Sequence, residues 1–115
     1  MKKIFWLFAV SILLGIQTFA KEYHVSVKGK DDNPGIFSQP FRTISAAANI
    51  ALPGDVITVH EGVYRERVDP QYGGLNNNQR IVYKAAENED VWIKGSEVVN
   101  TWEKYKDNVW KVILN

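Results

Sequence analysis

The chain has 115 residues, enough for one small domain, with 14 basic and 13 acidic side chains and no cysteine. The absence of cysteine excludes disulfide cross-links, although an exported protein could use them. The near balance of charge leaves no basic field that could hold nucleic acid or an anionic membrane surface.

Residues 1–20 have the composition of a secretory signal peptide. Lys2 and Lys3 form a basic start, an apolar run covers 4–16, and the segment ends at the small residue Ala20. The apolar run is too short to cross a hydrocarbon core of about 30 Å, so a membrane anchor is the less favoured alternative. We expect cleavage after Ala20, a secreted or periplasmic location, and no stable membrane insertion afterwards.

The first strand of the mature part is predicted at residues 23–27. Polar and apolar residues alternate there, which places Tyr23, Val25 and Val27 on one face of a half-buried strand. A cluster of turn-forming residues follows at 28–35.

Three polar residues of that cluster could suggest a calcium loop: Asp31, Asp32 and Asn33. The residue order and the distal glutamate of an EF-hand are missing. We therefore favour the interpretation that these side chains cap their own backbone in Asx turns.

A short capping helix is predicted at about 43–52. Thr43 is a suitable N-cap residue, and Pro53 with Gly54 would end the helix. One face carries an apolar stripe at helical spacing: Ile44, Ala47, Ala48 and Ala51. We expect this face to cover the open end of a sheet, because uncovered strand edges invite aggregation.

The strands after Asp55 return at a near-constant interval. Ile57 and Ile81 are 24 residues apart, as are Val59 and Tyr83. Val68 is predicted to begin or end a strand in between. Later strands are expected near Val91–Ile93, Val98–Val99, Trp102 and Val109–Leu114. A return every two dozen residues indicates a solenoid.

Four stretches then carry a family resemblance: YHVSVKG at 23–29, QPFRTISAA at 39–47, PGDVITVHEGVYRE at 53–66 and RIVYKA at 80–85. Together they resemble the amino-terminal end of secreted bacterial right-handed parallel β-helix proteins, the pectate-lyase-like superfamily. Its members include polysaccharide lyases and β-helical glycoside hydrolases of the β-xylosidase-like and α-galactosidase-like kinds.

The resemblance implies an all-β fold, a right-handed parallel β-helix of which this chain supplies the N-terminal cap helix and the first coils, residues 21–115. It also implies that sugar chains bind in an exterior groove and that catalytic groups sit in middle coils, beyond Asn115. We accordingly expect the chain to be the front of a longer protein and to be inactive alone, and we assign it no catalytic, cofactor-binding or metal-binding residue.

Some carboxylates could still form a glycosidase pair: Glu61, Glu66 and Asp69. No spacing fixes two of them at a productive separation. We expect instead that Glu66 pairs with Arg65 or Arg67 on a solvated face.

His60, next to Glu61, could act as a general base, although a histidine before a glycine turn is more often a turn residue. His24 is the weaker candidate. A lyase could use the arginines Arg65, Arg67 and Arg80, which we expect to be salt-bridged. Three tryptophans could stack on sugar rings, namely Trp92, Trp102 and Trp110, but Trp110 is expected to serve packing.

The function predicted from the sequence is the N-terminal part of a secreted carbohydrate-active β-helix protein, a glycoside hydrolase acting on plant or host oligosaccharides. The alternatives are a polysaccharide lyase on uronic-acid glycans and a non-catalytic glycan-binding or structural β-helix. The expected partner is a poly- or oligosaccharide, without a cofactor.

Overall fold

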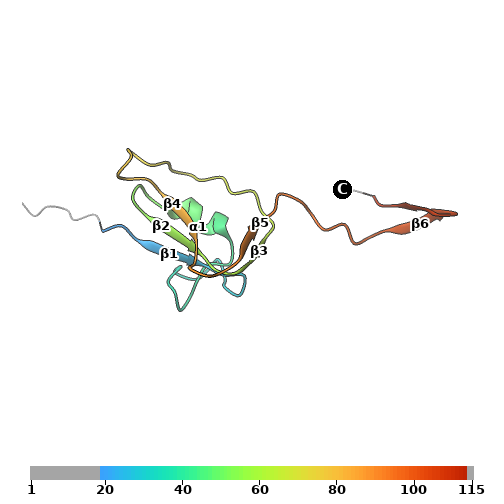
Figure 1. Ribbon diagram of the computed structural model, residues 1–115, viewed down its shortest axis with the longest axis horizontal. Helices are drawn as coiled ribbons and strands as arrows, with labels where there is room; N and C mark the ends of the chain where they lie inside the picture. Colours follow the sequence, from blue (N-terminus) through green and yellow to red (C-terminus); the bar gives the residue numbers. More distant parts are fainter. Residues whose placement is uncertain (1–18, 114–115) are drawn as a thin grey trace, which may run out of the picture.

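The computed structural model describes residues 19–113, which form one short helix and seven short strands (Figure 1). Nearly all of the predicted signal peptide lies outside this range, as does Leu114. The elements are β1 (Glu22–Val25), α1 (Ile44–Ile50), β2 (Val56–Val59), β3 (Gly62–Tyr64), β4 (Val82–Ala85), β5 (Val91–Ile93), β6 (Glu103–Lys106) and β7 (Val109–Lys111). Within residues 19–113 no helix is long and apolar enough to cross a membrane.

Parallel pairing joins strands from successive passes of the chain. One sheet has the order β1-β2-β4, and a second pairs β3 with β5, both parallel. Because parallel neighbours cannot be joined by a tight turn, each return needs a long crossover. The chain thus runs through the same two strand positions repeatedly.

The predicted 24-residue return is wrong by two residues. Ile57 lies opposite Tyr83, 26 positions later, and not opposite Ile81. The return from β1 to β2 takes more residues than the return from β2 to β4, since Tyr23 lies opposite Ile57. Side chains alternate with a period of two, so a shift of two residues keeps the same face buried. Apolar alternation alone therefore could not distinguish the two registers.

The two outer edges of the β1-β2-β4 sheet differ. The free edge of β1 is covered by the segment 35–41, where His24 N donates to Gly35 O at 2.7 Å and Ser26 N donates to Phe41 O at 2.8 Å. Among the described residues, the outer edges of β4 and β5 pair with no strand. One side of the sheet is closed and the other is open.

The core lies between the strands and the helix. Its fully enclosed large side chains are Val25, Ile44 and Ile57, and the remaining members of the cluster are Phe41, Ala47, Ala51, Val59 and Tyr64. Val27 was expected on the same face as Val25, but it is exposed because β1 ends at Val25. Val68 lies outside any strand and packs partly buried against the core.

Helix α1 begins where the sequence indicates. Thr43 is the N-cap, and its hydroxyl accepts a hydrogen bond from Ala46 N at 3.1 Å. The predicted apolar stripe is buried and the helix packs against β1 and β2. Small alanine side chains permit this close approach. After the helix, Gly54 adopts a φ of +96°, a conformation that favours glycine.

Two acidic side chains have partners that differ from those predicted. Asp31 Oδ1 accepts hydrogen bonds from Arg42 N and Thr43 N, both at 2.9 Å, so Asp31 orders the entrance to the helix and does not cap its own backbone. Glu66 binds the N–H groups of Ile44 and Ser45, each at 2.9 Å. The unpaired N–H groups of a helix start attract carboxylates, which explains why Glu66 binds there and not to a neighbouring arginine.

The C-terminal part departs from the expected solenoid strands. No strand covers Val98, Val99 or Trp102, and β6 pairs antiparallel with β7 in a hairpin. Figure 1 shows this hairpin projecting away from the parallel strands. Trp110 was expected to serve packing, but it is 58% exposed because the hairpin has no other layer against it.

Replacing Ile57 by alanine should lower the free energy of unfolding by about 2–5 kcal/mol, because it leaves a cavity in the core. Replacing Ile57 by aspartate should unfold the chain, since a charge without a partner would be buried. Chemical denaturation followed by circular dichroism measures both. Val63→Asp, at an exposed position of β3, is the matched control, and an equal loss in that variant would contradict the assignment of the core.

Glu66→Ala should lower the free energy of unfolding by about 1–2 kcal/mol, because two N–H groups at the helix start lose their acceptor. Glu66→Gln keeps one acceptor oxygen and should lose less. Glu87→Ala, an exposed residue, should leave the free energy nearly unchanged. If Glu66→Ala behaves like Glu87→Ala in urea unfolding, the capping role is refuted.

Candidate functional site

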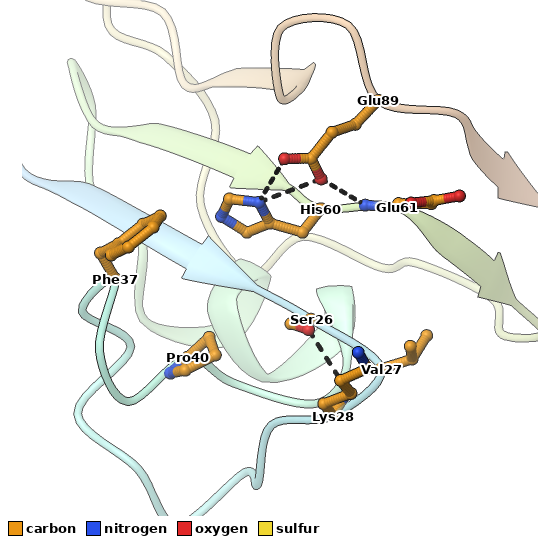
Figure 2. A pocket seen from close by; sticks show the side chains of 8 residues that line it. All are labelled: Ser26, Val27, Lys28, Phe37, Pro40, His60, Glu61 and Glu89. Carbon is orange, nitrogen blue, oxygen red and sulfur yellow. Dashed lines mark hydrogen bonds and ion pairs between the residues drawn. The ribbon is translucent and has the colours of Figure 1, made fainter.

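A cavity of about 610 Å³ opens beside the turn that links β2 to β3 (Figure 2). Its lining combines carboxylates, a histidine, a lysine and an aromatic ring: Ser26, Val27, Lys28, Phe37, Pro40, His60, Glu61 and Glu89. A hollow of about 760 Å³ near residues 19–21 and 52–55 is larger but has only Lys21 and Asp55 as charged groups. The convergence of titratable groups makes the smaller cavity the candidate site.

Glu89 is the centre of the polar network. Its Oε1 and Oε2 both lie 3.1 Å from His60 Nδ1, and Oε2 accepts a hydrogen bond from Glu61 N at 2.7 Å (Figure 2). The pKa of the Glu89 carboxyl is held below its usual range, first by the Glu61 N–H and then by His60. Glu89 is therefore a carboxylate at neutral pH.

His60 links this carboxylate to a second histidine. His60 Nε2 lies 3.0 Å from His24 Nδ1, and the two imidazole rings stack with centroids 5.3 Å apart. Because a carboxylate can only accept, His60 Nδ1 carries a proton. When His60 is neutral its Nε2 must accept, so His24 Nδ1 donates. The three side chains form one hydrogen-bonded chain whose proton positions are mutually dependent.

The side chain of Phe37 completes the wall of the cavity. Its ring packs edge-on against His24 and His60, with centroid distances of 5.4 and 5.7 Å and interplanar angles of 87° and 70°. Such contacts fix the orientation of an aromatic ring. Phe37 nevertheless remains 73% exposed, so a large, oriented apolar surface faces the solvent.

The pKa of His24 is lowered, mainly because burial disfavours the charged ring. Glu22 opposes this shift, while His60 and Lys84 add to it. The lowered pKa keeps His24 neutral at neutral pH, and its Nδ1–H can still donate to His60.

The structure brings together some of the residues singled out from the sequence and separates others. His60 and Glu61 line the cavity, and His24 joins it through His60. Glu66 caps the helix, and Asp69 is exposed elsewhere. No described pair of these carboxylates faces one another across the cavity as a glycosidase pair would.

Two of the arginines make other contacts, and the tryptophans are exposed. Arg65 donates to Ser96 O at 2.9 Å and Arg80 to Asn77 Oδ1 at 2.6 Å, so the expected salt bridges of these two are wrong. Arg67 is exposed. The tryptophans Trp92, Trp102 and Trp110 are exposed, at 61%, 54% and 58%.

Glu89 was not singled out from the sequence. The sequence separation between paired strands could have identified it. Gly62 lies opposite Val91, 29 residues later, and His60 and Glu89 are also 29 residues apart. Residues one coil apart are neighbours in space. Among residues 19–113 no group of three or more His, Asp or Glu side chains is arranged to hold a metal ion.

Comparison with known proteins identifies relatives of this region. Residues 27–75 match the model of a family described as a protein of unknown function, DUF1565. Uncharacterized protein YwoF of Bacillus subtilis strain 168 is 36% identical over 77 residues, covering 67% of this chain and 16% of YwoF. The solved complex of XylC with xylose matches with 54% identity and a TM-score of 0.75, covering 77% of this chain and 14% of XylC.

The predicted resemblance to the amino-terminal region of β-helix, pectate-lyase-like proteins is confirmed. The chain spans only about one sixth of YwoF and one seventh of XylC. Residues 27–75, which match the family model, contain α1, β2 and β3.

The depressed pKa of His24 predicts how stability depends on pH. An unfolded histidine binds a proton near pH 6.5, whereas folded His24 resists protonation until a lower pH. The unfolded state then holds more protons, so the free energy of unfolding should fall as the pH drops below about 6.5, until the folded pKa is passed.

The variant His24→Asn retains a donor for His60 but does not titrate, so its unfolding free energy should depend less on pH in this window. Urea unfolding at pH 7.5 and at successively lower values measures the slope. The contribution of Glu89, whose pKa is also depressed, is lost only at lower pH, below its ordinary value of 4.5. An identical slope in wild type and His24→Asn would contradict the half-buried, neutral state of His24.

Proposed function

We propose that this chain forms the capped N-terminal coils of a secreted, carbohydrate-active right-handed parallel β-helix protein, a glycoside hydrolase acting on plant or host oligosaccharides. The observation that carries the proposal is the match to XylC, solved in complex with xylose, at 54% identity. Identity at that level over 77% of the chain supports a shared architecture and a related ligand class.

The strand edges support a continuing β-helix. β4 and β5 pair with no further described strand, and Tyr83, Trp92 and Ile93 on them are partly or largely exposed. Such edges accept an additional strand. Further coils stacked on β4 and β5 would cover these side chains and extend the two parallel sheets.

The N-terminal side supports the role of a cap. The segment 35–41 closes the free edge of β1, and α1 packs its alanine-rich face against β1 and β2. A solenoid needs such a terminal unit to protect its stacking face. The basic and apolar leader of residues 1–20 supports export.

A chimera tests the structural role. Residues 22–95 of this chain would replace the matching N-terminal segment of XylC, and the chimera should be soluble and bind xylose with the affinity of XylC. The physical reason is that the β4 and β5 edges would receive the next XylC coil in the same register. Isothermal titration measures xylose binding, and a second chimera with Ile57→Asp is the unfolded control.

A product assay tests the reaction class. A protein that carries these coils should release reducing sugar from neutral oligosaccharides without forming an unsaturated product. An unsaturated, ultraviolet-absorbing product from uronic-acid oligosaccharides would identify a polysaccharide lyase. Binding without turnover would identify a glycan-binding β-helix, and an insoluble chimera would contradict the proposed architecture.

A further inference from the structure

The cavity beside the β2–β3 turn has the size and composition of a small-ligand site. Its volume of about 610 Å³ falls within the range of small-molecule pockets, although the cavity is open to solvent. It combines one exposed aromatic ring with a few polar groups. The hydrogen bonds to His60 and to the Glu61 N–H hold the Glu89 carboxylate in place before any ligand arrives.

Phe37 provides the apolar contact. A phenylalanine that is 73% exposed has no reason to be ordered by burial, yet the stacked imidazoles of His24 and His60 hold its ring edge-on. An oriented, exposed ring offers a flat surface to the C–H face of a sugar. Fixing that ring beforehand lowers the entropy cost of binding.

The polar groups of the cavity suit hydroxyls. Glu89 offers a carboxylate acceptor and Lys28 offers a donor on the cavity wall, while the Glu61 carboxylate extends to the far side of His60 from Phe37 (Figure 2). Neutral sugar hydroxyls can donate to Glu89 and accept from Lys28. Charge-assisted hydrogen bonds of this kind are stronger than neutral ones.

We propose that this cavity binds one neutral sugar residue, with its C–H face on Phe37 and its hydroxyls on Glu89 and Lys28, and with the Glu61 carboxylate at the rim. The proposal rests on the carbohydrate-directed function proposed above and adds a subsite in the first coils. The site selects against uronic acids, because a ligand carboxylate would meet two carboxylates and a single lysine.

Titration of the 115-residue protein with D-xylose, followed by NMR of the histidine and backbone resonances, tests the site. Xylose should shift the signals of His60 and Glu61 over a millimolar concentration range. D-Galacturonate, the anionic probe, should shift them less at equal concentration. Phe37→Ala should weaken xylose binding by about tenfold, and Phe37→Trp should restore it.

Tyr72→Ala is the matched control, because Tyr72 is an exposed aromatic residue that does not line the cavity. It should bind xylose as the wild type does. Phe37→Ala should also keep the wild-type unfolding free energy, since the ring is exposed, which separates lost binding from lost folding. Glu61→Gln should reduce the preference for xylose over galacturonate.

Three results would overturn the subsite: no shift with xylose, equal binding of galacturonate and xylose, or unchanged binding in Phe37→Ala. Each is distinguishable from failure of the proposed function. A soluble, xylose-binding chimera with XylC that is indifferent to Phe37→Ala would retain the carbohydrate function and reject the subsite.

Discussion

Parallel strand pairing is the constraint on which the rest of the molecule depends. Since neighbouring parallel strands need long crossovers, the chain must expose many backbone N–H groups between them. Carboxylates from other segments satisfy these donors. Asp31 binds the helix entrance, Glu66 the first helical N–H groups, and Glu89 the N–H of Glu61. Asp55 binds Lys21 N at 2.9 Å and Leu52 N at 2.8 Å. Four carboxylates thus bind backbone N–H groups in the segments that flank the strands and the helix.

The candidate site is a product of the same pairing. β2 and β4 lie side by side, and the turns that follow them place His60 against Glu89. The segment that covers the edge of β1 brings Phe37 onto both imidazoles. None of these groups is a neighbour of the others in the sequence. Glu89 therefore belongs both to the candidate site and to the carboxylates that bind backbone N–H groups. For this reason the shape of the cavity depends on the register of the sheets.

The sequence predicts the local elements well and the long-range contacts poorly. Thr43 and the alanine stripe locate α1, and the alternation around Ile57 locates β2, because both patterns reflect nearest-neighbour geometry. The register of β4 was wrong by two residues, which alternation cannot detect. The partners of Glu66 were wrong because a helix start 21 residues away competes with adjacent arginines. Glu89 was missed because only the sequence separation between paired strands identifies it.

The segments that connect successive parallel strands differ in length, which shows where the number of residues can vary. The pass from β1 to β2 differs in length from the pass from β2 to β4, yet both keep the strands in parallel register. The longer pass, from β1 to β2, contains α1. The shorter pass contains the exposed loop of residues 71–79, whose hydrogen bonds are local, as in Leu75 N to Gln79 O at 3.2 Å. Segments with such self-contained bonding tolerate inserted peptide. Evolution can thus lengthen this loop into a new surface beside the coils without moving the strands that align His60 with Glu89.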